Sequence, residues 1–166
     1  MIDAIDARIL TILQENARTS NAEIARQVDL APSAVFERIR KLEERGVIEG
    51  YTARVNAKAV GLPLLAFVFV RDEERPGEEI TSKLIADIPE VLEVHHVAGE
   101  DCLLVKVRTT DTDALGKLLR DRLGRIPTIV TTRTTIVLGT VKESSQLPLP
   151  LSSDASERGA EEPVRV

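Results

Sequence analysis

The chain has 166 residues, of which 43% are apolar and only 2% aromatic, so it is long enough for one or two small domains with aliphatic cores. The single cysteine, Cys102, excludes an internal disulfide. No apolar run approaches the ~20 residues of a membrane span, so we expect a cytoplasmic protein without a membrane partner. The net charge of -5 is unevenly placed, because residues 1–60 carry nine basic and nine acidic side chains. The acidic total therefore does not exclude nucleic-acid binding by the N-terminal part.

Residues 3–44 have the pattern of three short helices. Asp3 is a good N-cap for a helix that ends near Glu15. Ser20, followed three residues later by Glu23, is a capping box for a second helix, and Pro32 suits the first position of a third. Two short helices joined by a tight turn, followed by a predicted β-hairpin over 47–55, indicate a winged helix-turn-helix.

The third of these helices, which ends before Gly46, has an apolar stripe of Val35, Ile39 and Leu42. The remaining side chains are predicted to face outwards: Ser33, Ala34, Phe36, Glu37, Arg38, Arg40 and Lys41. Docking in a DNA major groove would account for small residues, an aromatic and three cations on one face. A solvated amphipathic helix is the alternative. Arg38 is the best candidate for DNA contact, whereas Arg40, Lys41 and Arg54 are phosphate contacts or plain surface.

The second half of the chain changes period. Apolar strands are expected over 64–70, 91–98, 102–108 and 129–141, with helices over 78–88 and after Asp111. The first of these helices has a predicted stripe of Ile80, Leu84, Ile85 and Ile88. The order β-α-β-β-α-β is that of the ferredoxin-like unit, which leaves one sheet face without helices and so favours oligomers.

The predicted fold class is therefore α+β, with a winged helix-turn-helix followed by a ferredoxin-like domain. We expect the DNA-binding domain over 1–55, a linker over 56–63, the second domain over 64–142, and a disordered tail over 143–166.

Four stretches together resemble the Lrp/AsnC (feast/famine) family of regulators: IDAIDARILTILQENAR, SNAEIARQVDLAPSAVFERIRKLEERGVIEGYTARV, GEDCLL and TTRTTIVL. The resemblance covers about residues 1–142 and implies a sequence-specific transcriptional regulator of double-stranded DNA. It also implies a homodimer that forms an octamer or another higher oligomer, with no catalytic residue, cofactor or metal. Ser20 and Arg54 join the outward face of the third helix as implied DNA-binding positions.

In this family the second domain often binds an amino acid, and the matching positions here are Gly99, Glu100, Asp101, Cys102, Thr132 and Thr134. The chain departs from the family pattern at three places. Ala31 replaces a usual Ser cap, at a cost of up to ~1 kcal/mol. Glu37 replaces a common basic residue, and Asp101-Cys102 replaces a frequent Tyr-Asp. We therefore expect weak or altered amino-acid specificity. The turn at Gly99 is alternatively a plain hairpin tip.

Two other functions compete with a regulator. Siroheme decarboxylases resemble this two-domain layout, and His95 and His96 motivate that alternative. Adjacent strand residues point to opposite faces, so the two imidazoles cannot easily bind one metal. The cationic third helix argues against the enzyme. A domain that only senses or assembles, without DNA contact, is a third reading.

Overall fold

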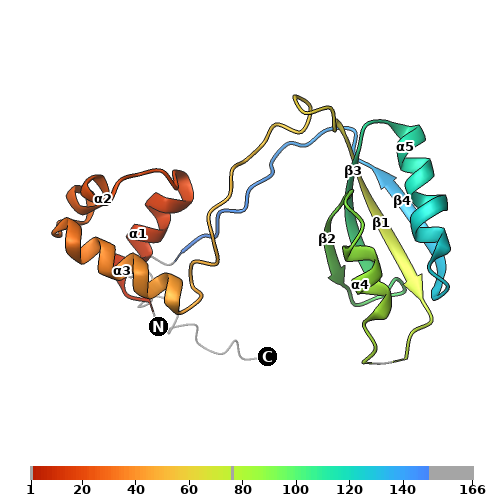
Figure 1. Cartoon of the computed structure of the whole chain (residues 1–166), viewed down its shortest axis with the longest axis horizontal. Coiled ribbons are helices and arrows are strands. Elements are labelled where there is room, and N and C mark those ends of the chain that lie inside the picture. The colour runs from red at the N-terminus through yellow and green to blue at the C-terminus, as the bar shows by residue number, and fades with distance from the viewer. Residues whose placement is uncertain (1, 76, 150–166) are drawn as a thin grey trace, which may run out of the picture. The chain divides into compact units, whose positions relative to one another are not determined.

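The computed structural model describes residues 2–75 and 77–149. The described residues form two compact units: residues 2–53 together with 143–149, and the described part of Arg54–Lys142. Figure 1 labels their helices and strands. No helix within the described residues is long and apolar enough to cross a membrane.

The first unit is built from three helices: α1 Ala4–Glu15, α2 Asn21–Val28 and α3 Pro32–Glu44. Their caps follow the sequence. Asp3 and Asp6 form a complete capping box at α1, and the Ser20 hydroxyl accepts from the Glu23 N–H at α2. The predicted box at α2 is only half formed, because the Glu23 carboxylate pairs with Arg26 instead of reaching back. The helices enclose an aliphatic core of Ile9, Ile24, Ala25, Val28, Val35 and Ile39.

The predicted wing is wrong, since no strand forms over 47–55, all of which the structure describes. Instead the chain folds back onto the end of α3. Gly46, with φ of 66°, ends the helix, and the Val47 N–H donates to the Leu42 carbonyl at 2.8 Å. The Tyr51 hydroxyl donates to Glu43 at 2.9 Å. Burial first, and this carboxylate second, raise the pKa of Tyr51 to about 12. The weak alternation around Gly50 therefore marks a folded-back connection.

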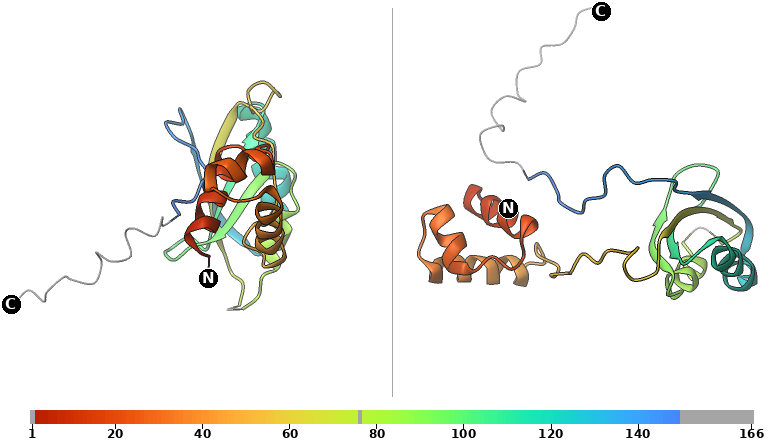
Figure 2. Two further views of the ribbon diagram at one scale, coloured as in Figure 1. Left: turned by 90° about the vertical axis from the view of Figure 1, so that its left-hand side faces the viewer. Right: turned by 90° about the horizontal axis from the view of Figure 1, so that it is seen from above.

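The second unit has the predicted β-α-β-β-α-β order, in a sheet of strand order β2-β3-β1-β4 with antiparallel neighbours. Its elements are β1 Leu64–Asp72, α4 Ile80–Ala86, β2 Val91–His96, β3 Leu103–Thr109, α5 Thr112–Lys117 and β4 Ile129–Ile136. A π turn, η1 Leu118–Arg122, and a 3-10 turn, η2 Leu123–Arg125, continue α5. Both α4 and α5 lie on one face of the sheet (Figures 1 and 2).

The core of the second unit lies between that face and the helices. Alternate residues of β1 and β3, among them Val68, Val70 and Val105, are buried there together with Ile85 of α4 and Leu115 of α5. The predicted stripe of α4 is partly wrong, because Ile80 and Leu84 are exposed while Thr81 is buried. Thr81 is satisfied by polar partners, since its hydroxyl lies 2.6 Å from Glu74 Oε1 and 2.6 Å from the Thr128 hydroxyl.

Candidate functional site

The outward face of α3 is set by the residues that α3 buries. Val35, Ile39 and Leu42 pack inwards, and Pro32 occupies the first helical position. Ala31 makes no side-chain cap, as its departure from the family pattern suggests. On the outside, Ser33, Glu37, Arg40 and Lys41 are exposed, and Phe36 is 53% exposed. Ala34 and Arg38 are only half-exposed.

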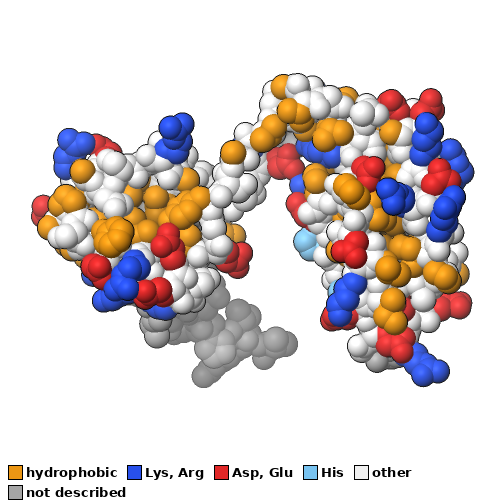
Figure 3. Space-filling view, viewed as in Figure 1, with side chains coloured by type: hydrophobic (Ala, Val, Ile, Leu, Met, Phe, Trp, Pro, Cys, Tyr) orange, Lys and Arg blue, Asp and Glu red, His pale blue; other side chains and the backbone are white. Residues whose placement is uncertain are grey.

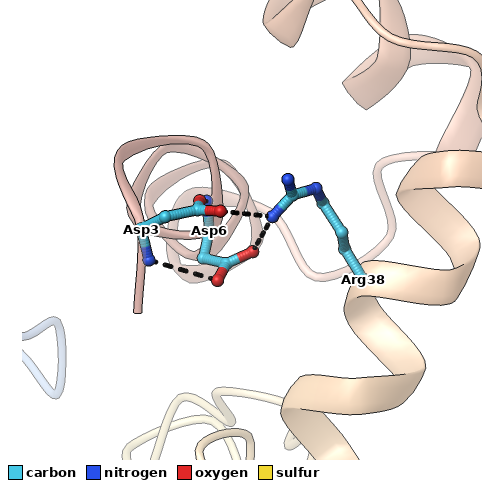
Figure 4. Close-up of polar contacts among 3 residues, drawn as sticks. All are labelled: Asp3, Asp6 and Arg38. Atoms are coloured by element: carbon cyan, nitrogen blue, oxygen red, sulfur yellow. Dashed lines mark hydrogen bonds and ion pairs between the residues drawn. The ribbon is translucent and has the colours of Figure 1, made fainter. Parts of the chain in front are cut away.

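Arg38 is not the outward-pointing cation that the helix pattern predicts. Its Nη1 donates to Asp3 Oδ2 and to Asp6 Oδ1, both at 2.7 Å, so the guanidinium points towards the start of α1 (Figure 4). The Asp6 side chain is 11% exposed and that of Arg38 is 32% exposed. The Asp6 N–H first, and the Arg38 guanidinium second, lower the pKa of Asp3. The two carboxylates raise the pKa of Arg38. We call Asp3, Asp6 and Arg38 the Arg38 clamp.

Arg40 stays on the exposed face but is also paired with acids. Its guanidinium contacts Glu37 and Glu44, each at 2.7 Å, and Glu37 is the main cause of the raised pKa of Arg40. Lys41 makes no ion pair with another residue of the described chain. In the space-filling view, basic and acidic side chains lie next to one another on the first unit (Figure 3).

A cleft of about 330 Å³ lies beside α3. It brings together four predicted DNA positions with three residues not predicted there, and is lined by Asp6, Ala34, Glu37, Arg38, Lys41, Leu42 and Arg45. The remaining predicted DNA positions lie elsewhere. Ser20 caps α2 through its hydroxyl, and Arg54 lies in irregular chain outside any helix or strand.

The predicted effector residues of the second unit divide between the two faces of the sheet. Thr132 and Thr134 lie opposite Val70 and Val68, on the face that the helices cover. Arg133 lies opposite Phe69 on the other face, where its guanidinium carbon is 4.0 Å from the Phe69 ring centre. Arg133 also donates to Asp101 at 2.8 Å, which links the turn to β4. We call Asp101 and Arg133 the Arg133 pair.

The rest of the turn is held by the backbone. Gly99 has φ of 146° and is exposed together with Glu100. The Cys102 N–H donates to the Val70 carbonyl at 2.9 Å, and its Sγ lies 3.9 Å from the Asp72 carbonyl. Cys102 packs against the core as a half-buried side chain, as its small hydrophobic character suggests.

Comparison with known proteins assigns the family. A family model described as Lrp/AsnC ligand binding domain matches residues 65–147, and one described as winged helix-turn-helix DNA-binding matches residues 2–49. The chain belongs to the Lrp/AsnC family of transcriptional regulators. It is 40% identical over 148 residues to the HTH-type transcriptional regulator FL11 of Pyrococcus horikoshii, covering 89% of this chain and 97% of that protein.

Two further Lrp/AsnC relatives agree. The leucine-responsive regulatory protein of Escherichia coli is 37% identical over 148 residues, covering 88% of this chain and 90% of the relative. The structure of a Neisseria meningitidis transcriptional regulator in complex with L-Met superposes with a TM-score of 0.85 at 30% identity, covering 89% and 97% of the two chains. These relatives are regulators, and they give no support to the decarboxylase alternative.

The two histidines that motivated the enzyme are both exposed strand residues. His95 Nε2 lies 3.4 Å from Glu93, whose other oxygen accepts from Lys106 at 3.0 Å. The Lys106 ammonium is the main cause of the lowered pKa of Glu93. Within residues 2–75 and 77–149, no cluster of three or more His, Cys, Asp or Glu is placed to bind a metal.

Sequence reasoning missed the partners that decide what the charged residues can do. The sequence identifies Asp3 only as a cap, whereas the structure shows that Asp3 and Asp6 together hold Arg38. The family resemblance points to Thr132 and Thr134 as effector positions and not to Arg133, which lies between them. It is the one cation in the strand TTRTT, and strand alternation places it on the opposite face from Thr132 and Thr134.

Proposed function

We propose that this regulator docks α3 in the DNA major groove and that Lys41, Arg40, Ser33 and Phe36 make the contacts. The observation that carries this proposal is the exposed outer face of α3 on a helix-turn-helix whose inner face is fully packed. Lys41 makes no ion pair among the described residues, although Asp6 and Glu37 line the same cleft, so its ammonium is ready for a phosphate. Ser33 lies in the first turn, where recognition helices approach base edges.

The acids on the same face limit this binding. Phosphate must displace Glu37 and Glu44 from Arg40, since both carboxylates contact its guanidinium at 2.7 Å. Glu37 is itself a possible acceptor for a cytosine amino group. A face with paired cations binds random DNA weakly, so we expect the base contacts to provide a large share of the affinity for the correct site.

The test is selection of duplexes from a random double-stranded DNA library, followed by fluorescence anisotropy across salt concentrations. Affinity for the selected duplex should fall by orders of magnitude between low and physiological salt, because bound phosphates release counterions. Lys41→Ala should weaken binding to all sequences and reduce the salt slope by about 1. Lys83→Ala, an exposed lysine of α4, is the control and should change neither.

Failure to select any duplex, even at low salt, would contradict DNA recognition and favour a domain that only senses or assembles. An unchanged salt slope in Lys41→Ala would remove Lys41 from the interface.

We further propose that an amino acid modulates the regulator at the turn around Gly99. The Arg133 pair offers one cation and one carboxylate, which complement the two charges of an amino acid. Arg133 is 62% exposed, so its carboxylate partner can be exchanged for that of a ligand. The L-Met complex of the Neisseria meningitidis relative supports this ligand class. Because the proposed function is the regulation of genes through DNA, we infer that the protein acts in the cytoplasm.

The uncovered sheet face supports a homodimer, with a higher oligomer such as an octamer as its further assembly. Phe67, Phe69 and Leu104 are half-buried there although no helix covers them. Thermal-shift screening of the standard amino acids, followed by sizing of any hit, tests ligand and assembly together. Arg133→Gln and Gly99→Asp should abolish the shift, whereas Arg125→Gln should keep it. No stabilisation of wild type, or an equal response in Arg133→Gln, would contradict this site.

A further inference from the structure

The Arg38 clamp joins the middle of α3 to the first turn of α1 through interlocked bonds. Asp3 Oδ1 accepts from the Asp6 N–H at 2.7 Å, and Asp6 Oδ2 accepts from the Asp3 N–H at 3.2 Å. Each carboxylate thus uses one oxygen for the helix cap and the other for Arg38 (Figure 4). The cap therefore fixes the direction of both acceptors before Arg38 arrives.

The clamp lies where it can set the orientation of α3. Arg38 precedes the buried Ile39 and lies between Ala34 and Leu42 on the same side of the helix. Apolar packing alone leaves small rotations and slides of a helix inexpensive, whereas two charge-assisted bonds to a fixed pair of oxygens are directional. A slide of α3 would break both bonds at once.

We propose that Arg38 is a positioning residue that aims the outer face of α3 through Asp3 and Asp6, and that it makes no DNA contact of its own. This proposal rests on the proposed DNA-binding function. It assigns the start of α1 to the recognition machinery, although that segment carries only acids and would itself repel phosphate. The alternative is that Arg38 leaves the clamp and reads DNA directly, as its place on α3 first suggests.

The two roles predict opposite effects when the acids are neutralised. If Arg38 reads DNA, Asp6→Asn frees the guanidinium and removes a negative charge, so binding becomes tighter. If Arg38 positions α3, the same change loosens the helix and weakens binding although the protein becomes less acidic. The sign of the effect therefore distinguishes the roles.

The experiment compares full-length wild type, Asp6→Asn, Arg38→Lys and Glu44→Gln on a selected duplex and on a scrambled duplex across salt concentrations. Asp6→Asn should lose about tenfold in affinity for the selected duplex, equal to about 1.4 kcal/mol, and lose less on scrambled DNA. Its salt slope should match wild type because no phosphate-binding cation is removed. Arg38→Lys keeps the positive charge that faces Asp3 and Asp6, so it should lose less affinity for the selected duplex than Asp6→Asn.

Glu44→Gln is the matched control, because it removes one of the two carboxylates that hold Arg40 on the same helix and should not weaken binding. Circular dichroism at the assay temperature confirms that each variant is folded, so that loss of stability alone would leave affinity unchanged. Equal or tighter binding by Asp6→Asn would overturn the proposal, as would a salt slope in Arg38→Lys or Asp6→Asn that departs from wild type.

Amide hydrogen exchange separates this proposal from the DNA-binding function. Exchange of α3 amides should be faster in Asp6→Asn than in wild type under conditions where both are folded. If wild type binds no DNA, the proposed function fails, and unchanged exchange in α3 would independently refute the positioning role.

Discussion

Two arginine–aspartate sites, one in each unit, use the same chemistry in different surroundings. The Arg38 clamp joins two helices, with Asp6 11% exposed and Arg38 32% exposed. The Arg133 pair joins a turn to an edge strand, with Asp101 24% exposed and Arg133 62% exposed. Water screens the second pair more than the first, and surface ion pairs contribute little to stability. The first site therefore suits a fixed structural role, and the second suits exchange with a ligand.

The largest expected contrast is in stability. Asp6→Ala should reduce the free energy of unfolding of the first unit by about 1–3 kcal/mol, because it removes a charged acceptor and leaves Arg38 half-buried with fewer partners. Asp101→Ala should cost under about 1 kcal/mol. Differential scanning calorimetry of both variants measures the difference. Equal costs would show that exposure does not separate the two sites.

Local signals predicted most of the elements but not the partners of their charged side chains. The caps at Asp3 and Ser20, and Pro32 at the first helical position, predicted the helix starts because each acts within one turn. The Arg38 clamp joins residues 35 and 32 positions apart, so it depends on how α1 packs against α3. Counting cations on a predicted outer face cannot show which of them are already paired.

Errors elsewhere have similar physical causes. Thr81 took a buried place in α4 because Glu74 and Thr128 satisfy its hydroxyl, which no apolar pattern can indicate. The composition of β4 predicts a strand, and the family resemblance points to Thr132 and Thr134 in it, but neither signal considers strand faces. Pairing with β1 puts Arg133 and Phe69 together on the uncovered side.

A smaller effect is expected from an exposed neutral contact at the end of α1. The Gln14 amide donates to the Leu147 carbonyl at 3.2 Å and accepts from its N–H at 2.6 Å, while Gln146 donates to the Gln14 carbonyl at 3.0 Å. The tail over 143–166, predicted from the sequence to be disordered, therefore divides at Leu149, the last described residue. Deleting 150–166, which lies outside the described residues, should leave the melting temperature unchanged.

Deleting 143–166 should lower the melting temperature by a few degrees, since it also removes these bonds, which are exposed to water and together contribute about 1 kcal/mol. Gln14→Ala in the full chain is the matched control and should reproduce most of that loss. Identical melting of the two truncations would show that the contacts of Gln146 and Leu147 contribute nothing.

The smallest expected effect is the response of each unit to acid. The pKa of Asp3 lies below its ordinary value of 3.8, chiefly through the Asp6 N–H, and that of Glu93 lies below its ordinary value of 4.5, chiefly through Lys106. A carboxyl whose pKa is lower folded than unfolded adds stability above the unfolded pKa, and that stability is lost as pH falls through the folded pKa. Wild type should therefore lose stability in both units below about pH 4.5.

Asp3→Asn keeps a good N-cap but cannot titrate, so the melting temperature of the first unit should fall less steeply between pH 5 and 3. Glu93→Gln should do the same for the second unit by a smaller amount, because Glu93 is 45% exposed and its lysine contact contributes less than a helix cap and a clamp. Parallel pH profiles for wild type and Asp3→Asn would show that the charge of Asp3 adds nothing to the Arg38 clamp.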